Sequence, residues 1–306
     1  MSNVNWPNFL IVGAAKAGTT ALYHQLTQHS EVFMSEQKEM NFFALKDQTL
    51  DFKGPGDMDG IHRTSITNQS IYISFFSNLK NKKAIGEVSP LYLYSPIAPE
   101  LINSLIPNSK IIIILRNPVD RAFSAFSHLR RDHREKIDDF EKAFDQNDTR
   151  KELNWAEIWH YKSMGLYFDQ VQRYLQYFPK NQMLFIIYDD FVNTPQKVLE
   201  KLCTFLSINS NFKFDTESKY NKSGTPRFQS FHQMLIRPHL FKKILKNFLP
   251  KFIRTHIRES LLNLNLKKNK SLTSAQFDSI YPAFKDDIEK LERLLNLDLS
   301  QWKSFE

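Results

Sequence analysis

The sequence has little cysteine, no long hydrophobic run and no low-complexity segment. Cys203 is the one cysteine among 306 residues, which excludes a disulfide framework and a cysteine-based zinc site within this chain. The apolar segment that ends at Gly13 is too short to span a bilayer and follows no basic region. We therefore expect no signal peptide or transmembrane helix, and a cytoplasmic location.

The composition is that of a globular protein. Hydrophobic residues make up 42% of the chain and charged residues 24%, which allows a large core and excludes a disordered protein. No internal repeat and no long Gly/Ser or Pro-rich linker interrupts the sequence. We therefore expect one domain over residues 1–306, with a helical insertion rather than a second domain.

Positive charge is concentrated in one segment. Residues 231–270 contain ten Lys or Arg and one acidic residue, a net charge of +9, whereas the whole chain carries +8. Such a segment is either a solvated helical face or a contact surface for something acidic, such as lipid head groups, a polyanionic substrate or nucleic acid.

Apolar runs alternate with helical patterns along the chain. Continuous apolar runs predict buried strands over 9–12, 84–88, 110–115 and 183–188. Apolar residues at helical spacing predict helices over 18–28, 118–131, 168–178, 195–206 and 274–297. This alternation predicts a parallel α/β sheet, in which ligands bind at the carboxyl ends of the strands.

A glycine-spaced loop follows the first predicted strand. Gly13 and Gly18 are separated by four residues, the spacing of a loop whose backbone N–H groups cradle a phosphate at a helix N-terminus. A nucleoside triphosphate loop would have lysine directly after the second glycine, but this chain has Thr19 there and places Lys16 earlier. The loop therefore predicts anion binding without a triphosphate.

An arginine follows the predicted strand over 110–115. A magnesium-dependent nucleotide triphosphatase would have an aspartate there, whereas this chain has Arg116. Ser124 falls about two turns into the helix that Pro118 begins. A guanidinium and a hydroxyl together form a receptor for a phosphate monoester, so the pattern favours a second anion site and no metal.

A set of motifs carries a resemblance to a known family. In chain order they are FLIVGAAKAGTTALY, KEMNFF, GEVSPLYL, LRNPVDRAFSAFSH, GLYFDQVQRYLQYFP, YNKSGTPR and DIEKLERLLNLDLSQW. With these motifs the chain resembles sulfotransferases that use 3′-phosphoadenosine 5′-phosphosulfate (PAPS), particularly bacterial members related to the carbohydrate (heparan-type) sulfotransferases. The resemblance implies a P-loop-like three-layer α/β fold with a central parallel sheet flanked by helices, plus the basic helical insertion.

The resemblance also implies roles for individual residues. The 5′-phosphosulfate would be held by Lys16, Ala17, Gly18, Thr19 and Thr20, and the 3′-phosphate by Arg116 and Ser124. A later loop that closes over the same phosphate would comprise Lys222, Ser223, Gly224 and Arg227. The resemblance also implies that Lys16 interacts with the bridging oxygen of the donor as the sulfuryl group departs.

Sulfuryl transfer needs a base for the acceptor's proton. The resemblance implies Glu39, just before Met40, Asn41 and an aromatic pair, and we expect an apolar surrounding that lets its carboxylate accept a proton near neutral pH. Glu87 and His128 are the runners-up.

The acceptor is expected to be a hydroxyl, less often an amine, on a carbohydrate, glycolipid or small metabolite. Many carbohydrate-branch relatives have a lysine where this chain has Val88, which weakens the inference of a sulfated glycan. Residues 228–270 are either a lid or, over 231–263, a basic amphipathic segment that contacts an anionic membrane and a lipid-linked acceptor. The competing hypotheses are a P-loop small-molecule kinase and a non-catalytic membrane- or nucleic-acid-binding protein. Under the sulfotransferase hypothesis we expect no nucleic acid among the binding partners.

Overall fold

The structure, a computed structural model, describes residues 5–77, 79, 82–217, 225–226, 266–267 and 271–305. These residues form a five-stranded sheet and a separate two-stranded one. The strands are β1 (Phe9–Gly13), β2 (Val32–Met34), β3 (Ala84–Val88), β4 (Lys110–Leu115), β5 (Met183–Ile187), β6 (Thr225–Pro226) and β7 (Leu266–Lys267).

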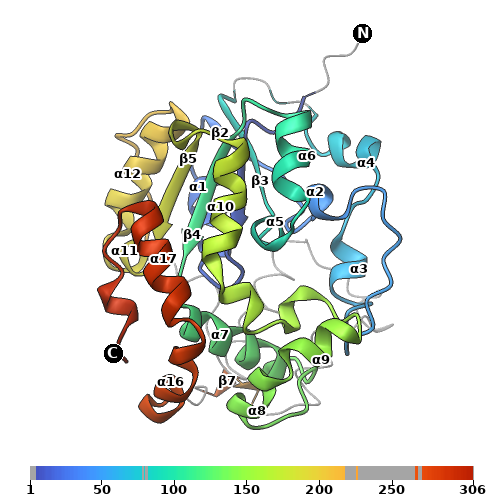
Figure 1. The fold of residues 1–306 in the computed structure, drawn as a ribbon. Coiled ribbons are helices and arrows are strands. Elements are labelled where there is room, and N and C mark those ends of the chain that lie inside the picture. The colour runs from blue at the N-terminus through green and yellow to red at the C-terminus, as the bar shows by residue number, and fades with distance from the viewer. Residues whose placement is uncertain are drawn as a thin grey trace.

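Helices cover both faces of the large sheet. In Figure 1, α10 passes in front of the strands and α1 behind them, while α7 lies beyond their carboxyl ends. The helices are α1 (Thr19–Leu26), α2 (Phe42–Leu45), α3 (Ile61–Thr64), α4 (Gln69–Ser74), α5 (Leu91–Tyr94), α6 (Ala98–Leu105), α7 (Pro118–Arg131), α8 (Phe140–Asp145), α9 (Asn147–Glu152), α10 (Tyr167–Tyr177), α11 (Tyr188–Asn193), α12 (Pro195–Leu206), α16 (Ser274–Ile280) and α17 (Lys285–Leu295). Short 3₁₀ turns occur at η1 (Glu157–Trp159), η2 (Ser163–Gly165), η3 (Lys180–Gln182), η4 (Tyr281–Ala283) and η5 (Ser300–Trp302). The three-layer α/β fold expected from the sequence is confirmed.

The order of the strands determines where a ligand can bind. The large sheet has the order β2-β3-β1-β4-β5, and all its neighbouring strands are parallel. The chain leaves β1 toward β2 on one side and leaves β4 toward β5 on the other. In open α/β sheets such a reversal between adjacent strands marks a ligand site at their carboxyl ends, and this order predicts one between β1 and β4.

The apolar runs form strands because both faces of the sheet are covered. Residues 111–115 of β4 are fully buried, and so are the first four residues of β1. Burying a large apolar side chain stabilises the fold by roughly 1.5–3 kcal/mol. At Gly86 of β3, the ring of Phe9 occupies the space that a Cβ would need, so the central strands pack closely.

Two differences from the predicted elements are large, whereas the bounds of β1, β5, α1 and α10 differ from the predicted ranges by only one or two residues. The helix expected over 274–297 is divided into α16, η4 and α17, because Pro282 cannot continue an α-helix. The edge strand β2 was not expected, since three residues are too few to show a periodic pattern. The predicted strands over 84–88 and 110–115 and the helices over 118–131 and 195–206 are confirmed at both ends.

Candidate active site

The glycine loop joins β1 to α1 at the switch point. Lys16 and Gly18 have φ of 69° and 88°, left-handed conformations that curl the loop. A side chain at Gly18 would also meet the ring of Tyr188, 3.0 Å from a Cβ placed there. No side chain caps α1, so the first N–H groups of this helix are available to an anion.

Lys16 lies half-buried among charged groups. Burial, and next the repulsion from Arg131, lower the pKa of Lys16 to about 8, while Glu39 and Asp132 oppose that shift. Arg116 also repels it. The loop lysine is therefore within electrostatic range of residues from the β4 end, the segment before α2 and the end of α7.

Arg116 lies directly against the glycine loop. Its Nη1 donates a hydrogen bond to the backbone oxygen of Lys16 at 3.2 Å, and its guanidinium stacks on Tyr188 at 4.7 Å from the ring centre. The Arg116 carbonyl accepts a hydrogen bond from the Tyr167 hydroxyl at 3.0 Å. The structure thus brings together Lys16 and Arg116, which are 100 residues apart in the chain. Ser124 is half-buried on α7.

The segment before α2 borders the loop. Glu39 has a left-handed φ of 57°, and its backbone N–H donates to the carbonyl of Val88 at 2.8 Å. The Glu39 side chain is exposed, so the expectation of an apolar environment for its carboxylate is wrong. Its neighbour Lys38 approaches Thr20 Oγ1 at 3.5 Å, and burial lowers the pKa of Lys38.

Glu87 occupies the core rather than the loop. Its carboxylate is fully buried and accepts hydrogen bonds from Tyr72, Tyr92 and Ser89, the first at 3.1 Å and the last at 3.3 Å. Burial raises the pKa of Glu87 to about 7, although the three hydroxyls partly oppose the shift. With its oxygens engaged by core hydroxyls, Glu87 is placed as a structural carboxyl group.

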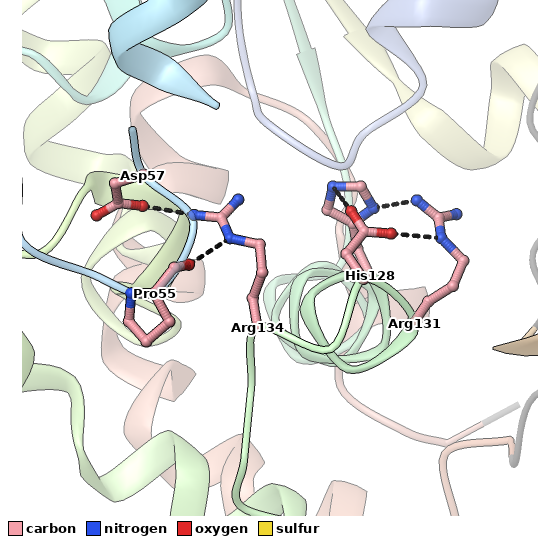
Figure 2. A network of polar contacts seen from close by, with 6 residues as sticks. Pro55, Asp57, His128, Arg131 and Arg134 are labelled. Carbon is pink, nitrogen blue, oxygen red and sulfur yellow. Dashed lines mark hydrogen bonds and ion pairs between the residues drawn. The ribbon is translucent and has the colours of Figure 1, made fainter. Parts of the chain in front are cut away.

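His128 faces Lys16 from α7. Its Nδ1 lies 2.5 Å from Arg131 Nη2, and its Nε2 lies 3.6 Å from Asp132 Oδ2. Figure 2 shows His128 beside Arg131, with the Asp57–Arg134 pair on the other side of the helix end. Burial, and next the charge of Lys16, lower the pKa of His128 to about 3.

Several site residues were not foreseen from the sequence. Lys38, Arg131, Asp132 and Tyr188 all lie at or near the loop. Arg131 and Asp132 follow His128 by three and four residues, a spacing that brings side chains together on a helix. This spacing could have indicated their contacts with His128. Tyr188 follows a predicted strand directly, and this position also could have indicated it.

One expected group of site residues cannot be placed. Lys222, Ser223, Gly224 and Arg227 lie outside the described residues, and so does the basic insertion over 228–270 apart from the two residues of β7 that it contains. β6, between Gly224 and Arg227, contacts α7, the helix that carries Ser124.

The described part of the chain offers neither a metal site nor a membrane-spanning helix. No cluster of three or more His, Cys, Asp or Glu side chains with the arrangement of a metal site occurs among the described residues. Within the same residues, no helix has the length and hydropathy required to cross a bilayer.

The position of Glu87 predicts a pH-dependent stability. A carboxyl group whose pKa is higher in the folded than in the unfolded chain stabilises the fold fully below about pH 4.5 and loses that contribution as pH rises through about 7. The Glu87→Gln variant has no carboxyl group to ionise at this position. We therefore expect its free energy of unfolding, relative to the parent's, to rise by on the order of 2–3 kcal/mol between pH 5 and pH 8. Urea unfolding at pH 5 and pH 8 measures this difference.

The exposed Glu152 supplies the control for that experiment. Glu152→Gln should follow the parent at both pH values. A Glu87→Gln variant whose stability relative to the parent is the same at pH 5 and pH 8 would contradict the placement of a titrating carboxyl in the core.

Comparison with known proteins agrees with this geometry. A family model described as "Sulfotransferase domain" matches residues 7–224. The chain is 25% identical over 281 residues to the membrane-associated sulfotransferase kil1 of Dictyostelium discoideum, covering 66% of this chain and 56% of that protein. It is 28% identical over 236 residues to the bifunctional heparan sulfate N-deacetylase/N-sulfotransferase 1 of Caenorhabditis elegans, covering 75% and 25%.

A solved structure extends the match to nearly the whole chain. The crystal structure of a sulfotransferase from Alicyclobacillus acidocaldarius superposes with a TM-score of 0.77 and 30% identity, over 98% of this chain and all of that one. By contrast, the chain spans about half and a quarter of the lengths of the two curated relatives named above. The family match covers most of the chain and includes the glycine loop, Arg116 and Ser124. The chain belongs to the sulfotransferase family.

Proposed function

We propose that this chain transfers a sulfuryl group from PAPS to a hydroxyl, less often an amine, of an acceptor. The observation that carries the proposal is the contact between Arg116 and the backbone of Lys16 at the carboxyl ends of β1 and β4. It brings two separate anion-binding elements, a helix N-terminus and a guanidinium, to the same edge of the sheet. PAPS carries two separate phosphate groups that such a pair can hold.

The residues present fit the donor. The uncapped start of α1 offers backbone N–H groups from the loop over Lys16–Thr20 to the 5′-phosphosulfate. Arg116 would hold the 3′-phosphate with Ser124, and the guanidinium fork suits two phosphate oxygens. Lys222, Ser223, Gly224 and Arg227 would complete this second site, as the sequence predicts.

The same residues argue against a magnesium-dependent kinase. Thr19 occupies the position where a triphosphate loop has its lysine, and Arg116 the position where an aspartate would hold magnesium. A cation in place of a carboxylate attracts an anion and repels a metal ion. The geometry therefore favours the sulfotransferase hypothesis over the kinase.

The charged groups around the loop suit the proton transfers that the reaction needs. When bound, PAPS supplies an activated sulfuryl group and leaves as adenosine 3′,5′-bisphosphate. Protonated Lys16 would lie beside the developing negative charge on the phosphate oxygen, which a preorganised cation stabilises. The carboxylate of Glu39, which interacts electrostatically with Lys16, would accept the acceptor's proton.

The names of the relatives bear on the acceptor. Relatives include heparan sulfate N-sulfotransferases and a membrane-associated sulfotransferase, which supports a glycan, a lipid-linked molecule or another small metabolite as acceptor. A cytoplasmic location with peripheral membrane contact through 231–263 stays a prediction from the sequence, because this segment lies outside the described residues.

Replacing Arg116 tests the donor site. We expect Arg116→Met to bind adenosine 3′,5′-bisphosphate roughly ten- to a hundredfold more weakly, because a hydrogen bond to a charged group contributes about 1.5–3 kcal/mol. Isothermal titration calorimetry without magnesium measures the affinity. Arg293→Met on α17 should bind like the parent. Equal affinity in Arg116→Met, or a parent protein that binds only ATP with magnesium, would contradict the proposal.

The lowered pKa of Lys16 predicts proton uptake on binding. The donor-free lysine loses its proton near pH 8, whereas two negative phosphates favour the charged form. We expect the affinity for adenosine 3′,5′-bisphosphate to fall as pH rises through 8, by up to tenfold per pH unit. Calorimetry at pH 8 in two buffers of different ionisation enthalpy measures the uptake. Lys16→Met should abolish it, and an affinity that is constant from pH 7 to 9 in the parent would exclude this role for Lys16.

Removing the Glu39 carboxylate tests the proposed base. Glu39→Gln should lower transfer of labelled sulfate from PAPS to acceptors in a cell extract by about 10²-fold or more, because general bases contribute that much. Its affinity for adenosine 3′,5′-bisphosphate should stay within about twofold of the parent's, since no contact with that ligand is expected. Glu36→Gln, an exposed carboxylate three residues away, is the matched control. Normal turnover in Glu39→Gln would assign the base to another group.

A further inference from the structure

His128 contacts a guanidinium through one of its two ring nitrogens. Arg131 Nη2 lies 2.5 Å from His128 Nδ1. A guanidinium can only donate hydrogen bonds, so Nδ1 must accept and carries no proton. The proton of the neutral imidazole is therefore on Nε2.

Asp132 completes a closed set of three side chains. Its Oδ1 accepts a hydrogen bond from Arg131 Nε at 3.0 Å, and its Oδ2 lies 3.6 Å from His128 Nε2. The second distance is longer than a hydrogen bond, so the Nε2 proton stays available to an oxygen of a bound ligand. The carboxylate therefore holds Arg131 beside the imidazole.

The surrounding charges keep the imidazole neutral. Lys16 from the glycine loop and Arg131 and Arg134 from the α7 end repel a proton on His128, and Asp132 opposes them. Asp57 partly neutralises Arg134 through a contact of 2.5 Å, and the Pro55 carbonyl accepts from its Nε at 2.6 Å. Burial acts in the same direction as the three cations, and neutral His128 is expected throughout the physiological pH range.

These contacts separate the roles of His128 and Glu39. A general base needs a free lone pair, and the lone pair on Nδ1 is taken by Arg131. The Glu39 side chain is exposed, and its carboxylate acts electrostatically on Lys16. The acceptor's proton is therefore better accepted by Glu39.

We propose that Arg131 is a positioning residue that holds His128 as a neutral imidazole protonated on Nε2. His128 then serves as a hydrogen-bond donor to a ligand oxygen beside Lys16, and Glu39 accepts the acceptor's proton. The role in catalysis rests on the proposed function, but the protonation state is a property of the donor-free protein. The two can therefore be tested separately.

Long-range ¹H–¹⁵N correlation spectra of the full chain with ¹⁵N-labelled histidine test the proposal. The chain has nine histidines, and the spectrum of His128→Gln assigns the signals of His128. We expect the pattern of the Nε2–H tautomer, unchanged between pH 5 and 8. A proton on Nδ1, or a titration in that range, would overturn the proposal, and adenosine 3′,5′-bisphosphate binding by the same sample tests the proposed function independently.

Replacing Arg131 tests its positioning role. Arg131→Met removes the hydrogen bond that requires Nδ1 to accept, so His128 should give signals of both neutral tautomers. The appearance of the Nδ1–H tautomer is a change that a loss of stability alone would not produce. Arg130→Met is the matched control, because Arg130 lies on the same helix but contacts Asp138 and the Glu135 carbonyl.

An unchanged His128 spectrum in Arg131→Met would exclude a positioning role for Arg131. Should that variant fail to fold, the spectrum of the parent protein still decides whether Nδ1 carries a proton.

Discussion

The contact between Arg116 and the glycine loop is the interaction on which the site depends. It joins the ends of two adjacent strands whose following connections turn in opposite directions, and the stacking on Tyr188 holds the guanidinium in place. One hydrogen bond of 3.2 Å contributes only about 1 kcal/mol to stability. Its importance is geometric, because it sets a cation beside a helix N-terminus that has no side-chain cap.

Three acidic residues illustrate how surroundings divide roles among similar groups. Glu87, with its oxygens held by core hydroxyls, belongs to the packing of the sheet. Asp132 accepts a hydrogen bond from Arg131, and Glu39 is exposed near Lys16. Glu39 and Asp132 both act on the loop lysine, but of the three only Glu39 is exposed, whereas Asp132 is half-buried and bonded to Arg131. Burial and hydrogen-bond partners, rather than residue type, therefore distinguish the candidate base.

Much of this arrangement was predictable from the sequence because parallel strands end at one edge of a sheet. The apolar runs before Gly13 and Arg116 are typical of parallel strands that helices cover on both faces. The residues that follow the two strands therefore lie at the same edge of the sheet. The surroundings of Glu39 were not predictable, because its segment has no periodic pattern. Nor was the Asp57–Arg134 pair, which joins irregular segments 77 residues apart. Helical spacing could have indicated the Arg131–His128 contact, but only the structure shows which ring nitrogen of His128 accepts the hydrogen bond.

A crystal of this chain with adenosine 3′,5′-bisphosphate is the most direct measurement of the central claim. The account predicts that the 5′-phosphate accepts hydrogen bonds from the backbone of the loop that includes Lys16 and Gly18, and that the 3′-phosphate contacts Arg116 and Ser124. Density for the nucleotide elsewhere, or a 3′-phosphate that makes no contact with Arg116, would contradict it.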